Sequence, residues 1–245
     1  MAVHYSVKRA LPNFFTFGSM MCGFFSVIYA VQKDFEFAAW LIIIGTVADT
    51  LDGVMARLTK TSSHFGVQLD SLSDVISFGF APAFLLLAIN NTFDNFYLIA
   101  ACLLYLFAGG FRLARFNSEL VGFSKEYFKG LPIPSSAIMV SAYVLLFSDN
   151  SIPAGNNSLF STLLAFSLAF LMASRIKFDM IPSLNKEGIM KRPVFSFLLL
   201  VSTIAAIITK GRGLFFIFLL FILYGILRGI IYSFHHRPVD VKVQE

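Results

Sequence analysis

Four aspartates lie within a stretch of 26 residues that interrupts two long apolar runs of the chain: Asp49, Asp52, Asp70 and Asp74. A carboxylate that is isolated in the hydrocarbon of a membrane is destabilising, so four of them require partners or bound cations. Four oxygen ligands with no histidine or cysteine among them suit magnesium, manganese or calcium rather than zinc. Such ions also take phosphate oxygens, and a pair of them can stabilise an in-line displacement at a diphosphate. The aspartates therefore predict metal-dependent phosphate chemistry.

Helical periodicity places these aspartates on two surfaces that can face each other. At about 100° per residue, Asp49 and Asp52 fall on one side of a helix, within an arc of roughly 140° that also holds three further residues. Those three are Gly53, Ala56 and Arg57. Asp70 and Asp74 are one turn apart and share a face of the next helix with Gly66. Because a short turn joins the two helices, they run antiparallel and the two pairs can share ions.

The small and basic residues beside the first pair fit a phosphate ligand. Gly53 and Ala56 leave space for a planar group or a diphosphate to approach the helix backbone. Arg57 offers a permanently charged, forked guanidinium, which binds phosphate well. The stretch 49–57 therefore predicts one wall of a phosphate site.

The spacing of these residues resembles the signature of the CDP-alcohol phosphotransferase family. The pattern D-x2-D-G-x2-A-R-x8-G-x3-D-x3-D is present at all eight fixed positions between Asp49 and Asp74. The resemblance implies that Asp49, Asp52 and Asp70 hold the metals, which would be two Mg²⁺ or Mn²⁺ ions. It also implies that Asp74 contacts one metal and acts as the general base on the hydroxyl of an acceptor alcohol.

The same resemblance implies a site for a CDP-linked lipid beside the metals. Its expected lining residues are Gly53, Ala56, Arg57 and Gly66, with Ser63 as a further phosphate contact. Asn13 and Thr16 are candidates for a nucleotide contact, although an ordinary helix start explains both of them as well.

Four other segments resemble the version of the family found in the membrane-spanning phosphatidylserine synthases of bacteria and archaea. They are residues 12–16, 69–83, 111–117 and 128–134. This resemblance implies CDP-diacylglycerol as the donor, L-serine as the acceptor, and phosphatidylserine and CMP as the products. A sibling transferase that uses glycerol 3-phosphate or an inositol compound stays open as the alternative.

The carboxylate of serine would require a cation in the acceptor pocket. Arg112 and Arg115 lie one turn apart near the end of a predicted helix, and Lys129 lies in a Lys-Gly-Leu-Pro segment. These three residues are candidates for binding serine. The ordinary enrichment of arginine at cytoplasmic helix ends explains the two arginines equally well, and phosphorylated acceptors would also require cations.

The composition indicates that the helices carrying these residues are solvated mainly by lipid. Of the 245 residues, 57% are hydrophobic, 30 are phenylalanine and only 13% are charged, whereas soluble domains are normally about a quarter charged. A spanning helix needs about 20 mainly apolar residues. We expect an all-α integral membrane protein with eight transmembrane helices, at about residues 12–32, 35–58, 69–90, 95–115, 132–148, 158–175, 193–209 and 213–234.

We expect residues 1–245 to form a single membrane domain. The links between the predicted helices are short, and the longest of them, at about 175–192, is too short to fold alone. The fold resemblance to the family extends over about the first six helices, which gives a catalytic core at about 12–175. The two helices within about 193–234 would be additions to that core.

The distribution of basic residues predicts the orientation. With both termini in the cytoplasm, 16 of the 19 lysines and arginines fall on the cytoplasmic side. The active site then faces the cytoplasm as well. The net charge of +5 is explained by a basic collar that meets anionic lipid head groups, so we expect no nucleic-acid partner. A prokaryotic plasma membrane fits best, and the family resemblance implies a homodimer.

The aspartates could also belong to a structural ion-pair network or to a cation transporter or channel. An ion-pair network would need more basic residues than the two that lie near them in sequence, Arg57 and Lys60. A cation transporter or channel tends to place its polar groups near the membrane midplane, often in two repeated halves. Here the acids gather towards one end of two helices, and the sequence holds no second copy of the motif. Both interpretations are weaker than a transferase.

Overall fold

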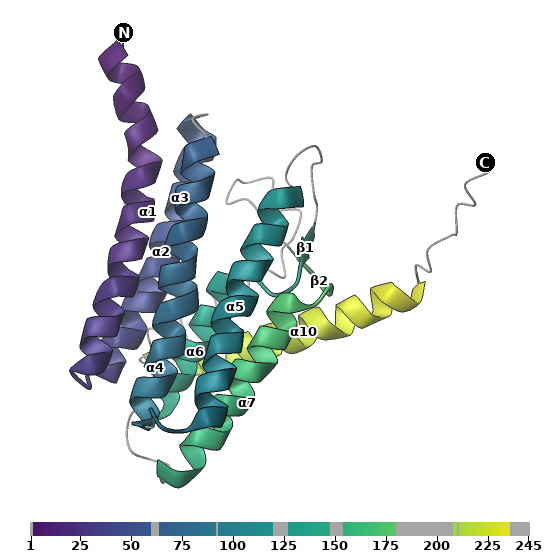
Figure 1. Cartoon of the computed structure of the whole chain (residues 1–245). Helices are drawn as coiled ribbons and strands as arrows, with labels where there is room; N and C mark the ends of the chain where they lie inside the picture. Colours follow the sequence, from purple (N-terminus) through teal and green to yellow (C-terminus); the bar gives the residue numbers. More distant parts are fainter. Residues whose placement is uncertain are drawn as a thin grey trace.

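The computed structural model describes residues 2–59, 64–91, 93–119, 127–147, 154–179, 208–209 and 211–235. Its elements, in chain order, are α1 (Ala2–Val31), α2 (Phe35–Thr59), α3 (His64–Asp74), the π-helix η1 (Val75–Phe80), α4 (Ala81–Asn90), α5 (Phe96–Glu119), β1 (Tyr127–Lys129), α6 (Ile133–Phe147), α7 (Ala154–Ala173), β2 (Lys177–Asp179) and α10 (Gly213–His235). The helices from α1 to α7 lie side by side as a bundle (Figure 1).

Four helical stretches are long and apolar enough to cross a membrane: Asn13–Val31, Phe35–Met55, Phe65–Asn90 and Phe96–Ser118. Three shorter apolar helices, Ile133–Phe147, Ser158–Ala173 and Gly213–Gly229, accompany them in the part of the chain that the structure describes. The prediction of an all-α membrane protein is confirmed, and helices occur in all six predicted core regions. The number of spans stays a prediction, because all but the last two residues of the predicted helix 193–209 lie outside the described residues.

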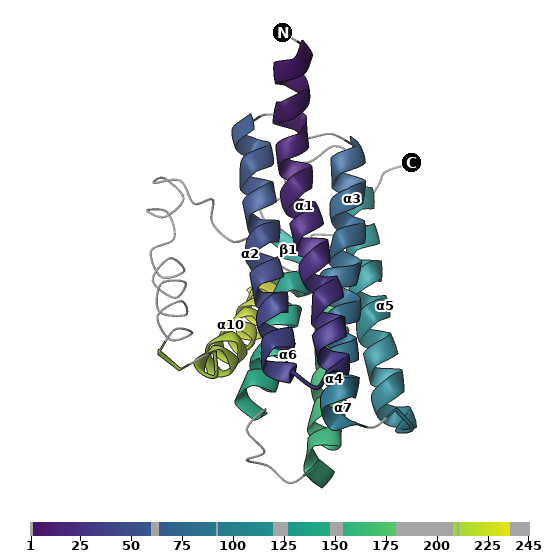
Figure 2. The same cartoon turned by 90° about the vertical axis from the view of Figure 1, so that its left-hand side faces the viewer.

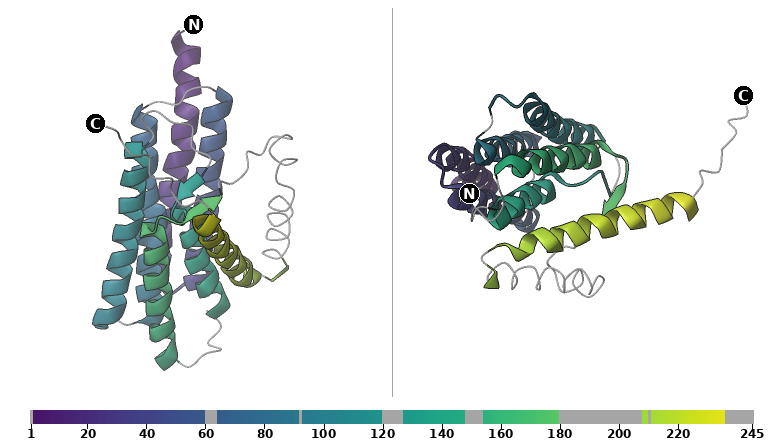
Figure 3. Two further views of the ribbon diagram at one scale, coloured as in Figure 1. Left: turned by 90° about the vertical axis from the view of Figure 1, so that its right-hand side faces the viewer. Right: turned by 90° about the horizontal axis from the view of Figure 1, so that it is seen from below.

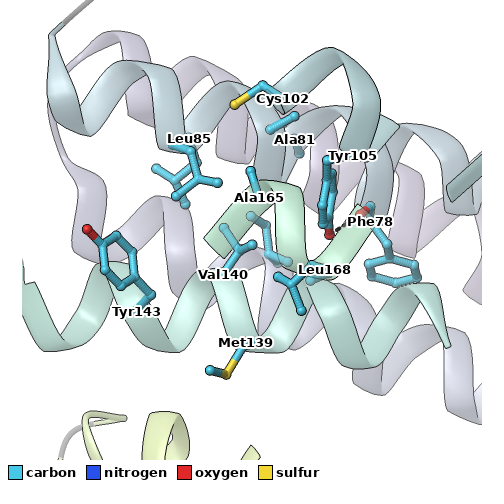
Figure 4. Packing of buried hydrophobic residues seen from close by; sticks show 14 of the residues in the cluster. Phe78, Ala81, Leu85, Cys102, Tyr105, Met139, Val140, Tyr143, Ala165 and Leu168 are labelled. Carbon is cyan, nitrogen blue, oxygen red and sulfur yellow. Dashed lines mark hydrogen bonds between the residues drawn. The ribbon is translucent and has the colours of Figure 1, made fainter. Parts of the chain in front are cut away.

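The outer surface of the bundle is apolar, as a lipid-facing surface must be. Phe14 and Phe107 are both 71% exposed, and Phe170 is 67% exposed. Inside, large side chains from η1, α4, α5, α6 and α7 pack together (Figure 4). The hydroxyl of the fully buried Tyr105 donates a hydrogen bond to the carbonyl oxygen of Phe78, 3.0 Å away, which ties α5 to η1.

The π-helix η1 interrupts the long rod that begins as α3 and continues as α4. At its end the backbone N–H of Ala81 bonds to the carbonyl oxygen of Ile76, five residues earlier. A π-turn holds one more residue than an α-turn, and each residue turns the helix by about 100°. The buried face of α4 is therefore rotated by about 100° from the position that an uninterrupted α-helix after α3 would give it. The apolar pattern predicts one regular helix over residues 69–90 and gives no sign of this turn.

A small two-stranded ribbon closes one end of α7, which an all-α prediction does not include. Strands β1 and β2 pair antiparallel, with Phe128 opposite Phe178. After β1, Gly130 adopts a φ of 84° and donates its N–H to the carbonyl oxygen of Ile176 at 2.8 Å. A Cβ at this glycine would lie 2.3 Å from the carbonyl oxygen of Met172. The Lys-Gly-Leu-Pro segment is thus anchored on the end of α7.

Helix α10 crosses the bundle at a steep angle instead of running along it (Figure 3). It packs on α6 and β2. The turn that precedes it is held in place by Gly211, whose φ is 87° and where a Cβ would meet Leu145 and Trp40 at 2.5 and 3.1 Å. The prediction of a helix at 213–234 is confirmed, whereas its spanning orientation stays a prediction.

Candidate metal and phosphate site

Three of the four aspartates converge between α2 and α3. Asp49, Asp70 and Asp74 each present a carboxylate oxygen within 4.8 Å of the corresponding oxygens of the other two. Asp49 therefore lies close enough to both other carboxyls to interact with them electrostatically. Three like charges at this spacing repel one another strongly in an apolar environment. The arrangement therefore requires a proton or a cation between them.

The cluster has the donor set of a site for a hard divalent cation. Asp74 is only 7% exposed. One carboxylate oxygen of Asp70 and one of Asp74 are buried with no hydrogen-bond partner among the described residues. Buried oxygens of this kind are destabilising unless something binds them, and carboxylate oxygens are the ligands that magnesium and manganese prefer. The residues present fit the metal site that the sequence predicts.

Asp52 differs from the other three aspartates. Its carboxylate accepts a 2.8 Å hydrogen bond from the hydroxyl of Thr16 on α1. It lies near Asp70 but outside the group of three. The sequence predicts that the four aspartates form one cluster. In the structure Asp49, Asp70 and Asp74 converge, and Asp52 is hydrogen-bonded to the neutral hydroxyl of Thr16.

Helix α1 is tightly attached to the helix that carries Asp70 and Asp74. The hydroxyl of Ser73 donates to the carbonyl oxygen of Thr16 at 3.0 Å, and that of Ser77 donates to the carbonyl oxygen of Ser19 at 2.9 Å. One turn further along, a Cβ at Gly23 would lie 2.6 Å from the Cα of Ser77. Figure 2 shows α1 lying against both aspartate-bearing helices.

The residues predicted to line the CDP site are described only in part. Gly53 follows Asp52 on α2, and Gly66 lies on α3, one turn before Asp70. Asn13 lies on α1, one turn before Thr16. The side chains of Ala56 and Arg57, and all of Ser63, lie outside the described residues. Their nucleotide contacts stay predictions.

The basic residues predicted to bind serine differ in their surroundings. Arg112 is 5% exposed and close enough to Asp74 for a charge interaction. The guanidinium of Arg115 donates to the carbonyl oxygens of Ala173 and Ser174, at 3.2 and 3.1 Å. Arg115 therefore caps the C-terminal end of α7, as basic residues commonly do. The sequence places both arginines on one acceptor-binding face, and only Arg112 lies beside the cluster. The side chain of Lys129 lies outside the described residues.

Several polar residues around the cluster are absent from the sequence-based site. The amide of Asn117 on α5 donates to the hydroxyl of Ser71, 2.8 Å away, in the turn that separates Asp70 from Asp74. The serines that bind α1 follow the same helix at a spacing of four residues. The hydroxyl groups of Ser73 and Ser77 in an apolar run indicate that hydrogen-bond partners exist, because buried hydroxyl groups need them. The sequence does not show that these partners lie on α1.

Comparison with known proteins finds a matching family model and several similar proteins. A family model described as CDP-alcohol phosphatidyltransferase matches residues 9–173, which include all four aspartates. A Helicobacter pylori protein named CDP-diacylglycerol–serine O-phosphatidyltransferase is 35% identical over 222 residues, covering 89% of this chain and 90% of the relative. A Methanocaldococcus jannaschii protein of the same name is 37% identical over 190 residues, covering 78% and 83%. An archaetidylserine synthase from Methanothermobacter thermautotrophicus is 38% identical over 138 residues, covering 56% and 58%.

Proposed function

The chain belongs to the CDP-alcohol phosphatidyltransferase family, and on that premise we propose that it transfers a phosphatidyl group from CDP-diacylglycerol to the hydroxyl of L-serine. The products are phosphatidylserine and CMP. The observation that carries the donor chemistry is the buried cluster of Asp49, Asp70 and Asp74. The serine assignment rests on relatives that are named for serine transfer and are aligned with most of this chain.

The four aspartates would hold two divalent ions, Mg²⁺ or Mn²⁺. Asp49, Asp70 and Asp74 supply the converging oxygens, and Asp52 adds a fourth carboxylate nearby. When bound, such ions neutralise a diphosphate and stabilise the charge that develops on the oxygens of the transferred phosphoryl group. The glycine after Asp52 leaves the helix backbone open to a ligand, and Arg57 supplies a cation for the phosphates.

Asp74 acts as the general base. Its carboxylate takes the proton from the serine hydroxyl while the serine oxygen forms its bond to phosphorus and the bond from phosphorus to the CMP oxygen breaks. Asp74 suits this role because it is buried in the cluster and lies close enough to Arg112 on α5 for a charge interaction, so an acceptor held by that arginine would be near it. Burial at 7% exposure also keeps competing water away from the base.

Arg112 binds the carboxylate of serine. It lies on α5 beside Asp74, so a carboxylate held by its guanidinium would bring the attached hydroxyl towards the base. Arg115 is the weaker candidate, because its guanidinium is bonded to the end of α7. Lys129 is a further candidate for the same pocket.

We further propose that the enzyme is a homodimer in a prokaryotic plasma membrane, with its termini and active site in the cytoplasm. The excess of basic residues in the predicted cytoplasmic loops supports that orientation. Bacterial and archaeal relatives support that membrane.

One assay tests the function. Purified protein in detergent is given CDP-diacylglycerol, Mn²⁺ or Mg²⁺, and one of three acceptors: serine, glycerol 3-phosphate or inositol phosphate. We expect CMP release and phosphatidylserine formation with serine alone. CMP release with a different acceptor would reject the serine assignment only, and no release with any acceptor would reject the transferase.

A further inference from the structure

Thr16 contacts both of the helices that carry the aspartates. Its hydroxyl donates to Asp52 on α2 at 2.8 Å, and its carbonyl oxygen accepts a hydrogen bond from Ser73 on α3 at 3.0 Å. Ser73 is the residue before Asp74. Thr16 is 4% exposed and Asp52 is 7% exposed, so water does not substitute freely for either bond.

The hydroxyl of Thr16 orients the carboxylate that it contacts. A carboxylate has two oxygens, and a donor on one of them restricts rotation of the group while the other can still meet a cation. Residues that hold a metal ligand in this way commonly change metal affinity when they are replaced. Asp52 has this support from a neutral group, which adds no charge to a site that already holds four acids.

The position of Thr16 is itself fixed by packing along α1. The bond from Ser77 to Ser19 lies about one turn beyond it. The close approach of Gly23 to Ser77 lies one turn further again. These contacts prevent α1 from sliding along α3 and η1. Any displacement of α1 would therefore move the hydroxyl away from Asp52.

We propose that Thr16 is a positioning residue that holds the Asp52 carboxylate for a divalent cation and sets its place relative to Asp74. This role is distinct from the nucleotide contact for which the sequence makes Thr16 a candidate. It rests on the proposed function only in taking the aspartate cluster as a metal site. The role makes a distinctive prediction, because loss of the hydroxyl should weaken metal binding and leave the affinity for CDP-diacylglycerol unchanged.

The test uses two substitutions at this residue and one control. Thr16→Val keeps the shape and removes the hydroxyl, whereas Thr16→Ser keeps the hydroxyl. Thr46→Val is the control, since Thr46 is a similarly buried threonine of α2 whose hydroxyl bonds to its own helix, at the carbonyl oxygen of Ile42. For each protein, Mn²⁺ binding is measured from the EPR signal of free Mn²⁺. The KM for CDP-diacylglycerol is then measured at saturating Mn²⁺, and thermal unfolding in detergent is recorded.

We expect Thr16→Val to weaken Mn²⁺ binding by about 10- to 100-fold, with the KM for CDP-diacylglycerol within about twofold of the wild type. Thr16→Ser and Thr46→Val should bind Mn²⁺ as the wild type does. Unchanged Mn²⁺ affinity in Thr16→Val would overturn the proposal, as would an equal loss in Thr46→Val. A wild-type protein that binds Mn²⁺ but releases no CMP would reject the transferase and leave the positioning role standing.

Discussion

Replacing Asp74 with asparagine tests its role as the general base, and comparison with Asp49→Asn separates that role from metal binding, to which both aspartates contribute. Asparagine has the shape of aspartate but cannot accept the proton of the acceptor hydroxyl. Because Asp74 is only 7% exposed, water has little room to act in its place. We expect kcat to fall by about 10²- to 10⁴-fold, the range that a positioned general base contributes. This loss corresponds to roughly 2.7 to 5.4 kcal/mol of transition-state stabilisation.

The measurement is the rate of CMP release at saturating serine and CDP-diacylglycerol over a wide range of Mn²⁺ concentration. Asp49→Asn is the matched control, because Asp49 belongs to the same group of three carboxylates and has no role as base. Asp49→Asn should recover part of its rate as Mn²⁺ is raised, and Asp74→Asn should not. A near-normal rate for Asp74→Asn, or a rate restored by Mn²⁺, would show that Asp74 is not the base.

Three further substitutions test the surroundings of the site. Gly23→Ala should lower activity severalfold, because its Cβ would lie 2.6 Å from the backbone of η1 and push α1 away; Gly18→Ala on the same helix, with nothing within 4 Å, should have little effect on CMP release. Gly130→Ala should lower the free energy of unfolding by more than about 1 kcal/mol, since its φ is positive and its Cβ would meet a carbonyl oxygen of α7 at 2.3 Å. Thermal unfolding checks this, with the unobstructed Gly110→Ala as its control. Arg112→Gln should raise the KM for serine by roughly 10- to 150-fold, the equivalent of about 1.5 to 3 kcal/mol for a charged hydrogen bond; an unchanged KM would remove Arg112 from the acceptor pocket.

The sequence by itself determined the class of the protein and the centre of its chemistry. The apolar runs are local, and a helix that spans hydrocarbon must satisfy its own backbone, so the core helices could be located from composition. Helical periodicity alone put Asp70 and Asp74 on one face. The spacing from Asp49 to Asp74 was specific enough to indicate the family, because every residue of that pattern lies on two neighbouring helices.

Tertiary structure decided how the aspartates are supported. Thr16 and Asp52 are 36 residues apart, and Arg115 bonds to a residue 59 positions away. Periodicity within one helix carries no information about such partners. Periodicity predicted that Arg112 and Arg115 share one face. In the structure Arg112 lies near Asp74, whereas Arg115 bonds to the end of α7. The π-turn after Asp74 likewise lies in contact with α1 and α5, through the bonds from Ser77 to Ser19 and from Tyr105 to Phe78. Which carboxylates meet, and what holds the remaining one, follows from how helices distant in sequence pack against each other.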